Sequence, residues 1–168
     1  MDKKILKISE NSLITSECFS YFKMGIIQTI PNYEEWLGDR FKLFIDSDGD
    51  ARFGEHGVIY TLTSFSDILK IEDGRILKWV GDRLIPFIIE SINAGKYVML
   101  DLNFAKISEK CERDFGLHET LVYGYDLAAG ELIVTELVNF SFREARIPFD
   151  KARESYEDVR RFFYNDTL

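Results

Sequence analysis

The sequence is poor in the residues that build disulfides and metal sites. It holds two cysteines, two histidines and three prolines among 168 residues. Two cysteines are too few for the disulfide framework of a small secreted domain, and the cysteines and histidines lack the spacing of metal ligands. Glycine-rich phosphate loops, nucleophile elbows and dinucleotide fingerprints are also missing. We therefore expect no metal and no cofactor.

Basic charge and long apolar runs are scarce as well. Lysine and arginine number 21 against 29 aspartates and glutamates, which gives a net charge of −8. An acidic chain is a poor ligand for nucleic acid and suits a cationic small molecule better. Apolar segments fall short of the roughly 18 residues that span a bilayer, and the N-terminus does not resemble a signal peptide. We expect a reduced, cytoplasmic protein without nucleic-acid or membrane partners.

One acidic stretch, residues 46–50, imitates the start of a calcium loop. Asp46, Asp48 and Asp50 alternate as calcium ligands do, but Ala51 and Gly57 occupy the positions that require a glycine and a bidentate acid. We interpret the stretch as a solvated turn.

What the chain does have is enough apolar material for one folded domain. Hydrophobic residues make up 46% of the sequence and aromatic residues 14%, so we expect residues 1–168 to form a single domain. Apolar periodicity indicates helices first and strands later, with a hairpin turn at 127–130 and a helix cap at Gly95. The expected helices are 17–29, 33–40, 64–70, 75–94 (weakened near Pro86) and 150–164, and the expected strands are 4–8, 41–45, 97–103, 118–125, 131–137 and 141–147. This order predicts an α+β fold, with an N-terminal helical part packed on a C-terminal antiparallel sheet.

Cys18 is the better candidate for a nucleophile. It falls in the first turn of an expected helix, where unpaired backbone N–H groups and the helix dipole stabilise a thiolate and can receive an oxyanion. Cys111 lies in a polar run that indicates an exposed loop. A buried cysteine that acts only as a small apolar residue is the competing interpretation of Cys18.

His118 is the candidate general base, because it opens an apolar run typical of a buried strand. Glu136, on the strand after the 127–130 turn, could orient its ring. Asp101, Asn103 and Asp126 are rivals for that role. The other histidine, His56, lies between glycines in an expected loop.

The order of these residues resembles papain-like cysteine enzymes of bacteria. The stretch His118-Glu-Thr-Leu-Val-Tyr-Gly-Tyr-Asp126 and the segment Ile147-Pro148-Phe149 at the start of a helix are similar to the acyltransferase group of butirosin biosynthesis, whose relatives lie beside nonribosomal peptide synthetase genes. A bacteriocin-processing type of peptidase is the second branch that the order resembles.

The resemblance implies a papain-like fold and an acyltransferase. An acyl group would pass from an acyl carrier protein to Cys18 as a thioester, and then to a small-molecule amine in secondary-metabolite biosynthesis. His118 would serve as base and Glu136 would orient it. The peptidases carry a glutamine about six residues before the cysteine, where this chain has Ser12, and their acid is usually aspartate or asparagine.

Two alternatives stay open: a cysteine peptidase or amidase of the same fold, and a non-catalytic papain-like module that binds a partner or metabolite. We predict substrate contacts for Asn11, beside the oxyanion position, and for Tyr123 and Tyr125, which could line an acyl groove. A cluster of basic residues near the C-terminus is interpreted as a solvated helix face; its members are Lys151, Arg153, Arg160 and Arg161.

Overall fold

The computed structural model describes residues 2–12, 18–40, 44–45, 51–52, 83–107, 116–138 and 141–164. Contacts divide the chain into two compact units. The sheet unit comprises Met1–Lys7 and Asp73–Leu168, and the insert unit comprises Ile8–Glu72. The expectation of a single domain stays a prediction. The expected helix at 64–70, the first part of the helix at 75–94 and the loop at 46–50 lie outside the described residues.

The sheet unit is an antiparallel sheet covered on one face by two helices, so the α+β class is confirmed. Its strands are β1 (Lys3–Ile5), β4 (Val98–Asn103), β5 (Leu117–Asp126), β6 (Glu131–Val138) and β7 (Ser141–Pro148). They pair in the order β1-β5-β6-β7, and β4 pairs with β5 on the edge that β1 also uses. The predicted 127–130 turn joins β5 to β6 and contains Gly130 at φ +69°.

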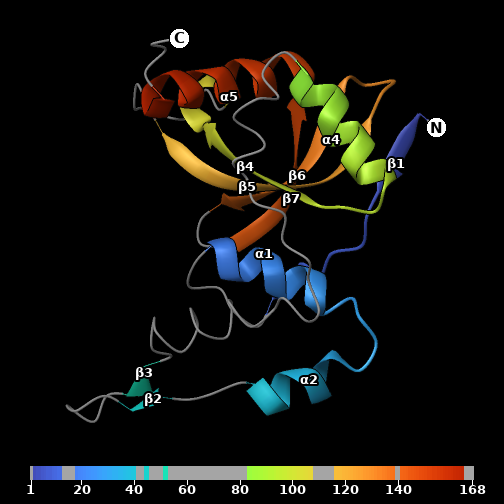
Figure 1. The fold of residues 1–168 in the computed structure, drawn as a ribbon, viewed down its shortest axis with the longest axis vertical. Coiled ribbons are helices and arrows are strands. Elements are labelled where there is room, and N and C mark those ends of the chain that lie inside the picture. The colour runs from blue at the N-terminus through green and yellow to red at the C-terminus, as the bar shows by residue number, and fades with distance from the viewer. Residues whose placement is uncertain are drawn as a thin grey trace. The chain divides into compact units, whose positions relative to one another are not determined.

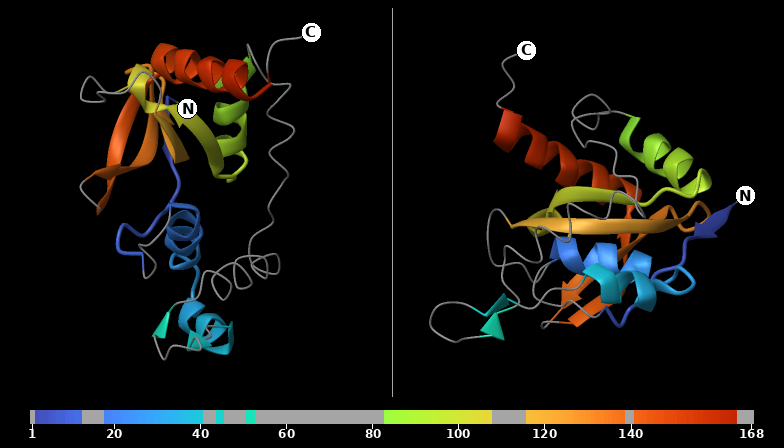
Figure 2. Two further views of the ribbon diagram at one scale, coloured as in Figure 1. Left: turned by 90° about the vertical axis from the view of Figure 1, so that its left-hand side faces the viewer. Right: turned by 60° about the horizontal axis from the view of Figure 1, so that its bottom comes forward.

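Helices α4 (Leu84–Asn93) and α5 (Phe149–Tyr164) lie on the same side of the sheet in both figures (Figures 1 and 2). We call this side the helix face. Their buried residues recur at helical spacing, as expected for amphipathic helices. The core of the unit consists of Leu84, Ile88, Ile92, Val98, Leu100, Leu102, Val122, Tyr125, Leu132, Val134, Ile147, Ala152 and Tyr156.

Pro86 and Gly95 mark the two ends of α4. Pro86 stands in the first turn, where the helix needs no backbone N–H from it, so it does not interrupt the helix. Gly95 adopts φ +78°, its N–H donates to the Ile92 carbonyl, and the N–H of Lys96 donates to the Ser91 carbonyl. These two bonds form a Schellman motif, which confirms the predicted cap.

A β-bulge interrupts the pairing of β5 with β6 between Val122 and Gly124, so Tyr123 is an extra residue on β5. The pairing of β4 with β5 stays regular from Leu117 to Val122. The bulge shifts the alternation of side chains along β5.

The insert unit contains α1 (Cys18–Ile27), α2 (Tyr33–Arg40) and the short antiparallel pair β2 (Phe44–Ile45) and β3 (Ala51–Arg52). The chain before α1 lies along that helix: the Ser9 N–H donates to the Gly25 carbonyl, and the Tyr21 hydroxyl donates to the Glu10 carbonyl at 2.7 Å. Burial, followed by the charge of Glu10, raises the pKa of Tyr21.

Candidate functional site

His118 lies at the start of β5, opposite Leu102 of β4. Its ring meets the ring of Phe104 edge to face, with centroids 5.4 Å apart and planes at 66°. Its Nδ1 lies 2.7 Å from the carbonyl oxygen of Glu119. Phe104 belongs to the 3-10 turn η4 (Phe104–Lys106), which follows β4 directly. Two neighbouring segments of the sheet unit therefore hold the imidazole.

Strand parity places His118 on the helix face. Val122 belongs to the core under α4 and α5, and no bulge separates it from His118 along β5. Side chains two and four residues apart on a strand point to the same side. Thr120, also on this side, is fully buried.

Backbone register assigns positions 118 and 136 to the same face of the β5–β6 hairpin, just beyond the last residues that pair between the two strands. Leu121 pairs with Thr135, so these two positions share one face of the hairpin. His118 is three residues from Leu121 and Glu136 is one residue from Thr135, so both positions belong to the other face. The pairing predicted for the two strands is thus confirmed. The side chain of Glu136 lies outside the described residues, so its role as orienting acid stays a prediction.

The rivals of Glu136 for orienting the His118 ring are two acids and one amide, and each is directed or bonded elsewhere. Asp101 stands between two core leucines on β4, so it points to the opposite face of the sheet. Desolvation by burial raises its pKa. Asp126, at the far end of β5, is engaged with Lys3 and Arg146.

Asn103, the third rival, is the centre of a structural cluster. It is fully buried, and its Oδ1 accepts from the N–H groups of Gly116 at 2.8 Å and of Ala105 at 3.1 Å. Its Nδ2 donates to the carboxylate of Asp158, and its own carbonyl accepts from the Ser155 hydroxyl at 3.0 Å. Asn103 therefore joins the end of β4 to α5. The sequence carries no local signal for this cluster, because its partners are 52 and 55 residues away.

Cys18 is the first residue of α1, and so it lies in the first turn of a helix, as predicted. Its side chain lies outside the described residues, as do Cys111 and His56. Cys18 belongs to the insert unit and His118 to the sheet unit, which the structure describes separately. Their pairing stays a prediction.

The bulge separates the two tyrosines that we expected to line a groove. Tyr125 is 1% exposed in the core on the helix face, and its hydroxyl donates to Asn93 at 2.8 Å. Tyr123 directs its hydroxyl to Glu144 on the opposite face, at 3.1 Å. We therefore assign Tyr125 to the core rather than to a substrate site. Asn11 is exposed, and its carbonyl accepts from Gln28 at 3.1 Å.

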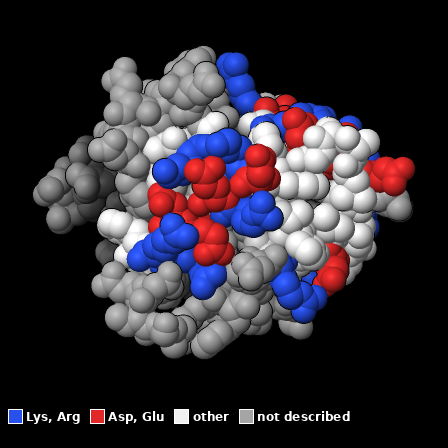
Figure 3. Space-filling model, turned by 90° about the horizontal axis from the view of Figure 1, so that it is seen from above, with Lys and Arg blue, Asp and Glu red and all other residues white. Residues whose placement is uncertain are grey.

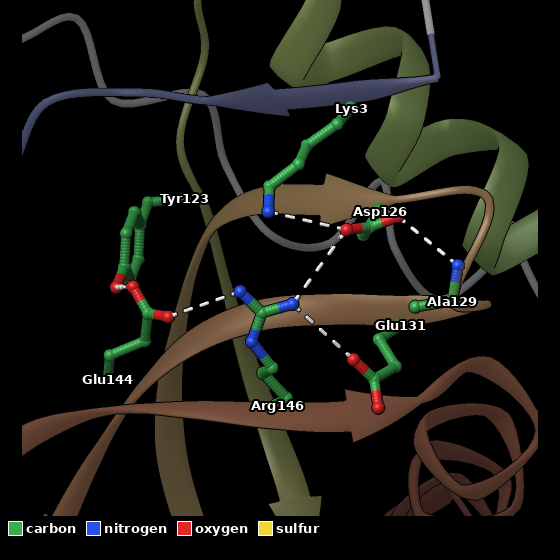
Figure 4. A network of polar contacts seen from close by, with 7 residues as sticks. All are labelled: Lys3, Tyr123, Asp126, Ala129, Glu131, Glu144 and Arg146. Atoms are coloured by element: carbon green, nitrogen blue, oxygen red, sulfur yellow. Dashed lines mark hydrogen bonds and ion pairs between the residues drawn. The ribbon is translucent and has the colours of Figure 1, made fainter.

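The opposite face of the sheet carries a network of ion pairs that the sequence did not reveal (Figure 4). Asp126 lies 3.3 Å from Lys3 and 3.8 Å from Arg146, and Arg146 also reaches Glu131 and Glu144 at 3.5 Å each. The Ala129 N–H, with help from Lys3 and Arg146, holds the pKa of Asp126 below its ordinary value. The network links β1 to β5, β6 and β7.

The basic residues of α5 are interspersed with acids, as Figure 3 shows for the face seen from above. Lys151 pairs with Glu154 at 3.1 Å, and Arg160 pairs with Glu157 at 3.0 Å. These pairs favour the interpretation of a solvated helix face.

Within the described part of the chain, histidines, cysteines and acids do not gather in threes as metal ligands would. Helices in this part are too short or too polar to cross a membrane. Comparison with known proteins found no matching family model, no matching curated protein and no matching solved structure.

Proposed function

We propose that the chain is a papain-like acyltransferase of secondary-metabolite biosynthesis, with Cys18 as nucleophile, His118 as base and Glu136 as supporting acid. The observation that carries the proposal is the shared face of His118 and Glu136 on the β5–β6 hairpin. Cys18 at the first residue of α1 supports it, because the first backbone N–H groups of a helix have no partner within the helix.

The proposed reaction has two steps. In the first, the Cys18 thiolate attacks the carbonyl of an acyl carrier thioester, which forms a thioester on Cys18 and releases the carrier thiol with a proton from His118. In the second, an amine attacks that thioester while His118 takes its proton, and an amide forms as the Cys18 sulfur leaves. The net charge of −8 favours the approach of a protonated amine, which gives up one proton to solvent before it attacks as the neutral amine.

Intact-mass spectrometry after incubation with acyl-pantetheine thioesters of graded chain length tests the first step. We expect a mass increase equal to one acyl group, which disappears in Cys18→Ser. Cys111→Ser is the matched control and should keep the increase. His118→Gln should slow acylation about 100-fold or more. Absence of an adduct with every donor would contradict the proposal.

A non-catalytic binding module is the second candidate, and one observation favours it. His118 lies on the helix face, beside Thr120 and the core residue Val122, and its Nδ1 contacts its own strand. In a binding module the histidine would stabilise the fold without serving Cys18.

Alkylation of Cys18 by iodoacetamide in the Cys111→Ser background separates the two candidates. If His118 is the base for Cys18, alkylation should stay fast below about pH 8.5, where an ordinary thiol ionises. His118→Gln should then slow alkylation in that pH range. If the chain is a binding module, the pH profile of alkylation should be the same with and without His118→Gln, because only the helix N-terminus then acts on the Cys18 thiol.

A further inference from the structure

The proton on the neutral imidazole of His118 can be assigned from one contact. Nδ1 lies 2.7 Å from the backbone carbonyl oxygen of Glu119, which is hydrogen-bonding distance. A carbonyl oxygen can only accept, so the nitrogen must be the donor. The proton therefore belongs on Nδ1, and Nε2 carries the lone pair.

The ring is also held in place from the side. Phe104 meets it edge to face. The N–H of Phe104 donates to the carbonyl of Gly116, the residue before β5, at 2.8 Å, so η4 is held against the start of that strand. The Asn103 side chain also joins η4 to the residue before β5, because its Oδ1 accepts from the N–H groups of Ala105 and Gly116. This packing opposes the rotation that would exchange the two ring nitrogens.

We propose that the backbone carbonyl of Glu119, and not a side-chain acid, is the group that sets the tautomer of His118 and makes Nε2 the proton acceptor of the site. If the proposed acyl transfer holds, Nε2 takes the proton of the Cys18 thiol, and Nδ1–H stays on the Glu119 carbonyl as the imidazolium forms. Glu136 would then support the imidazolium through its charge and not through a hydrogen bond to the ring.

The assignment is tested by ¹⁵N NMR of the imidazole nitrogens in the full chain without substrate, at a pH where the ring is neutral. The chain has only two histidines, so His56→Gln leaves the signals of His118 alone. We expect a protonated, pyrrole-type shift for Nδ1 and an unprotonated, pyridine-type shift for Nε2. The reverse pattern, or an averaged pair of shifts, would overturn the proposal.

Two matched variants then identify the group responsible. Glu119→Gln and Glu136→Gln each remove a carboxylate from β5 or β6 but keep every backbone carbonyl, so neither should change the tautomer. A reversed tautomer in Glu136→Gln would assign the role to that carboxylate. Phe104→Leu should shift the nitrogen signals towards an average. Because this readout needs no substrate, it can fail or succeed independently of acyl transfer.

Discussion

Gly124 on β5 lies directly against Lys4 on β1. A Cβ at position 124 would stand 2.8 Å from the Lys4 carbonyl oxygen, and the next nearest atom is the Cα of Ile5 at 3.2 Å. Because both atoms belong to the backbone, they cannot move aside without displacing β1.

Gly124→Ala should therefore destabilise the protein by about 1–3 kcal/mol, through overpacking between two strands. Urea unfolding of the variant and the parent chain measures the loss. Hydrogen exchange should show the effect concentrated at Leu6, whose N–H donates to the Tyr123 carbonyl. Unchanged stability would mean that β1 does not pack here.

Asn103→Ala should cost about 3 kcal/mol, because it leaves two partly buried N–H groups and the carboxylate of Asp158 without their partner. Ser155→Ala removes only one hydrogen bond of the same cluster and should cost about 1 kcal/mol. Urea unfolding compares the two. Equal losses would contradict the central position that we assign to Asn103.

Thr120→Val should stabilise the protein by about 1 kcal/mol. The Thr120 hydroxyl is fully buried and has no hydrogen-bond partner among the described residues, and valine has nearly the same shape. The melting temperature and urea midpoint should both rise. A destabilised variant would reveal a partner for the hydroxyl, such as a buried water molecule.

Asp126 should make stability sensitive to acid. Its pKa is lower in the folded chain than in the unfolded one, so its contribution is present above the unfolded-state value, about 3.9, and is lost as pH falls through the folded-state value. Asp126→Asn should therefore destabilise the protein at pH 7 and flatten the acid side of its stability profile. Glu154→Gln, which breaks an exposed pair on α5, is the control and should leave that profile almost unchanged.

Local patterns predicted most of the described fold. The β5–β6 hairpin follows from alternation and a turn that ends in glycine, and the charged helix predicted at 150–164 matches α5 to within one residue. Residues 33–40 were predicted with the bounds that α2 has. Each of these signals lies within a few residues of the structure that it specifies.

What the sequence did not reveal depends on partners far along the chain. Strict alternation puts Tyr123 and Tyr125 on one face, and only the bulge, set by the pairing of β5 with β6, separates them. Asn103 and Arg146 are polar residues on strands, and nothing beside them in the sequence indicates the clusters that they form. Cys18 and His118 are linked only by resemblance, so their pairing stays a prediction.

The position of β1 has a consequence for how the protein is made. Lys3–Ile5 is synthesised early but pairs with Gly124–Asp126, about 120 residues later. On the ribosome, the first strand must wait while the whole insert unit and half of the sheet unit emerge. Until then the backbone groups of β1 have no strand to pair with, so the pairing of β1 with β5 is a late step of folding.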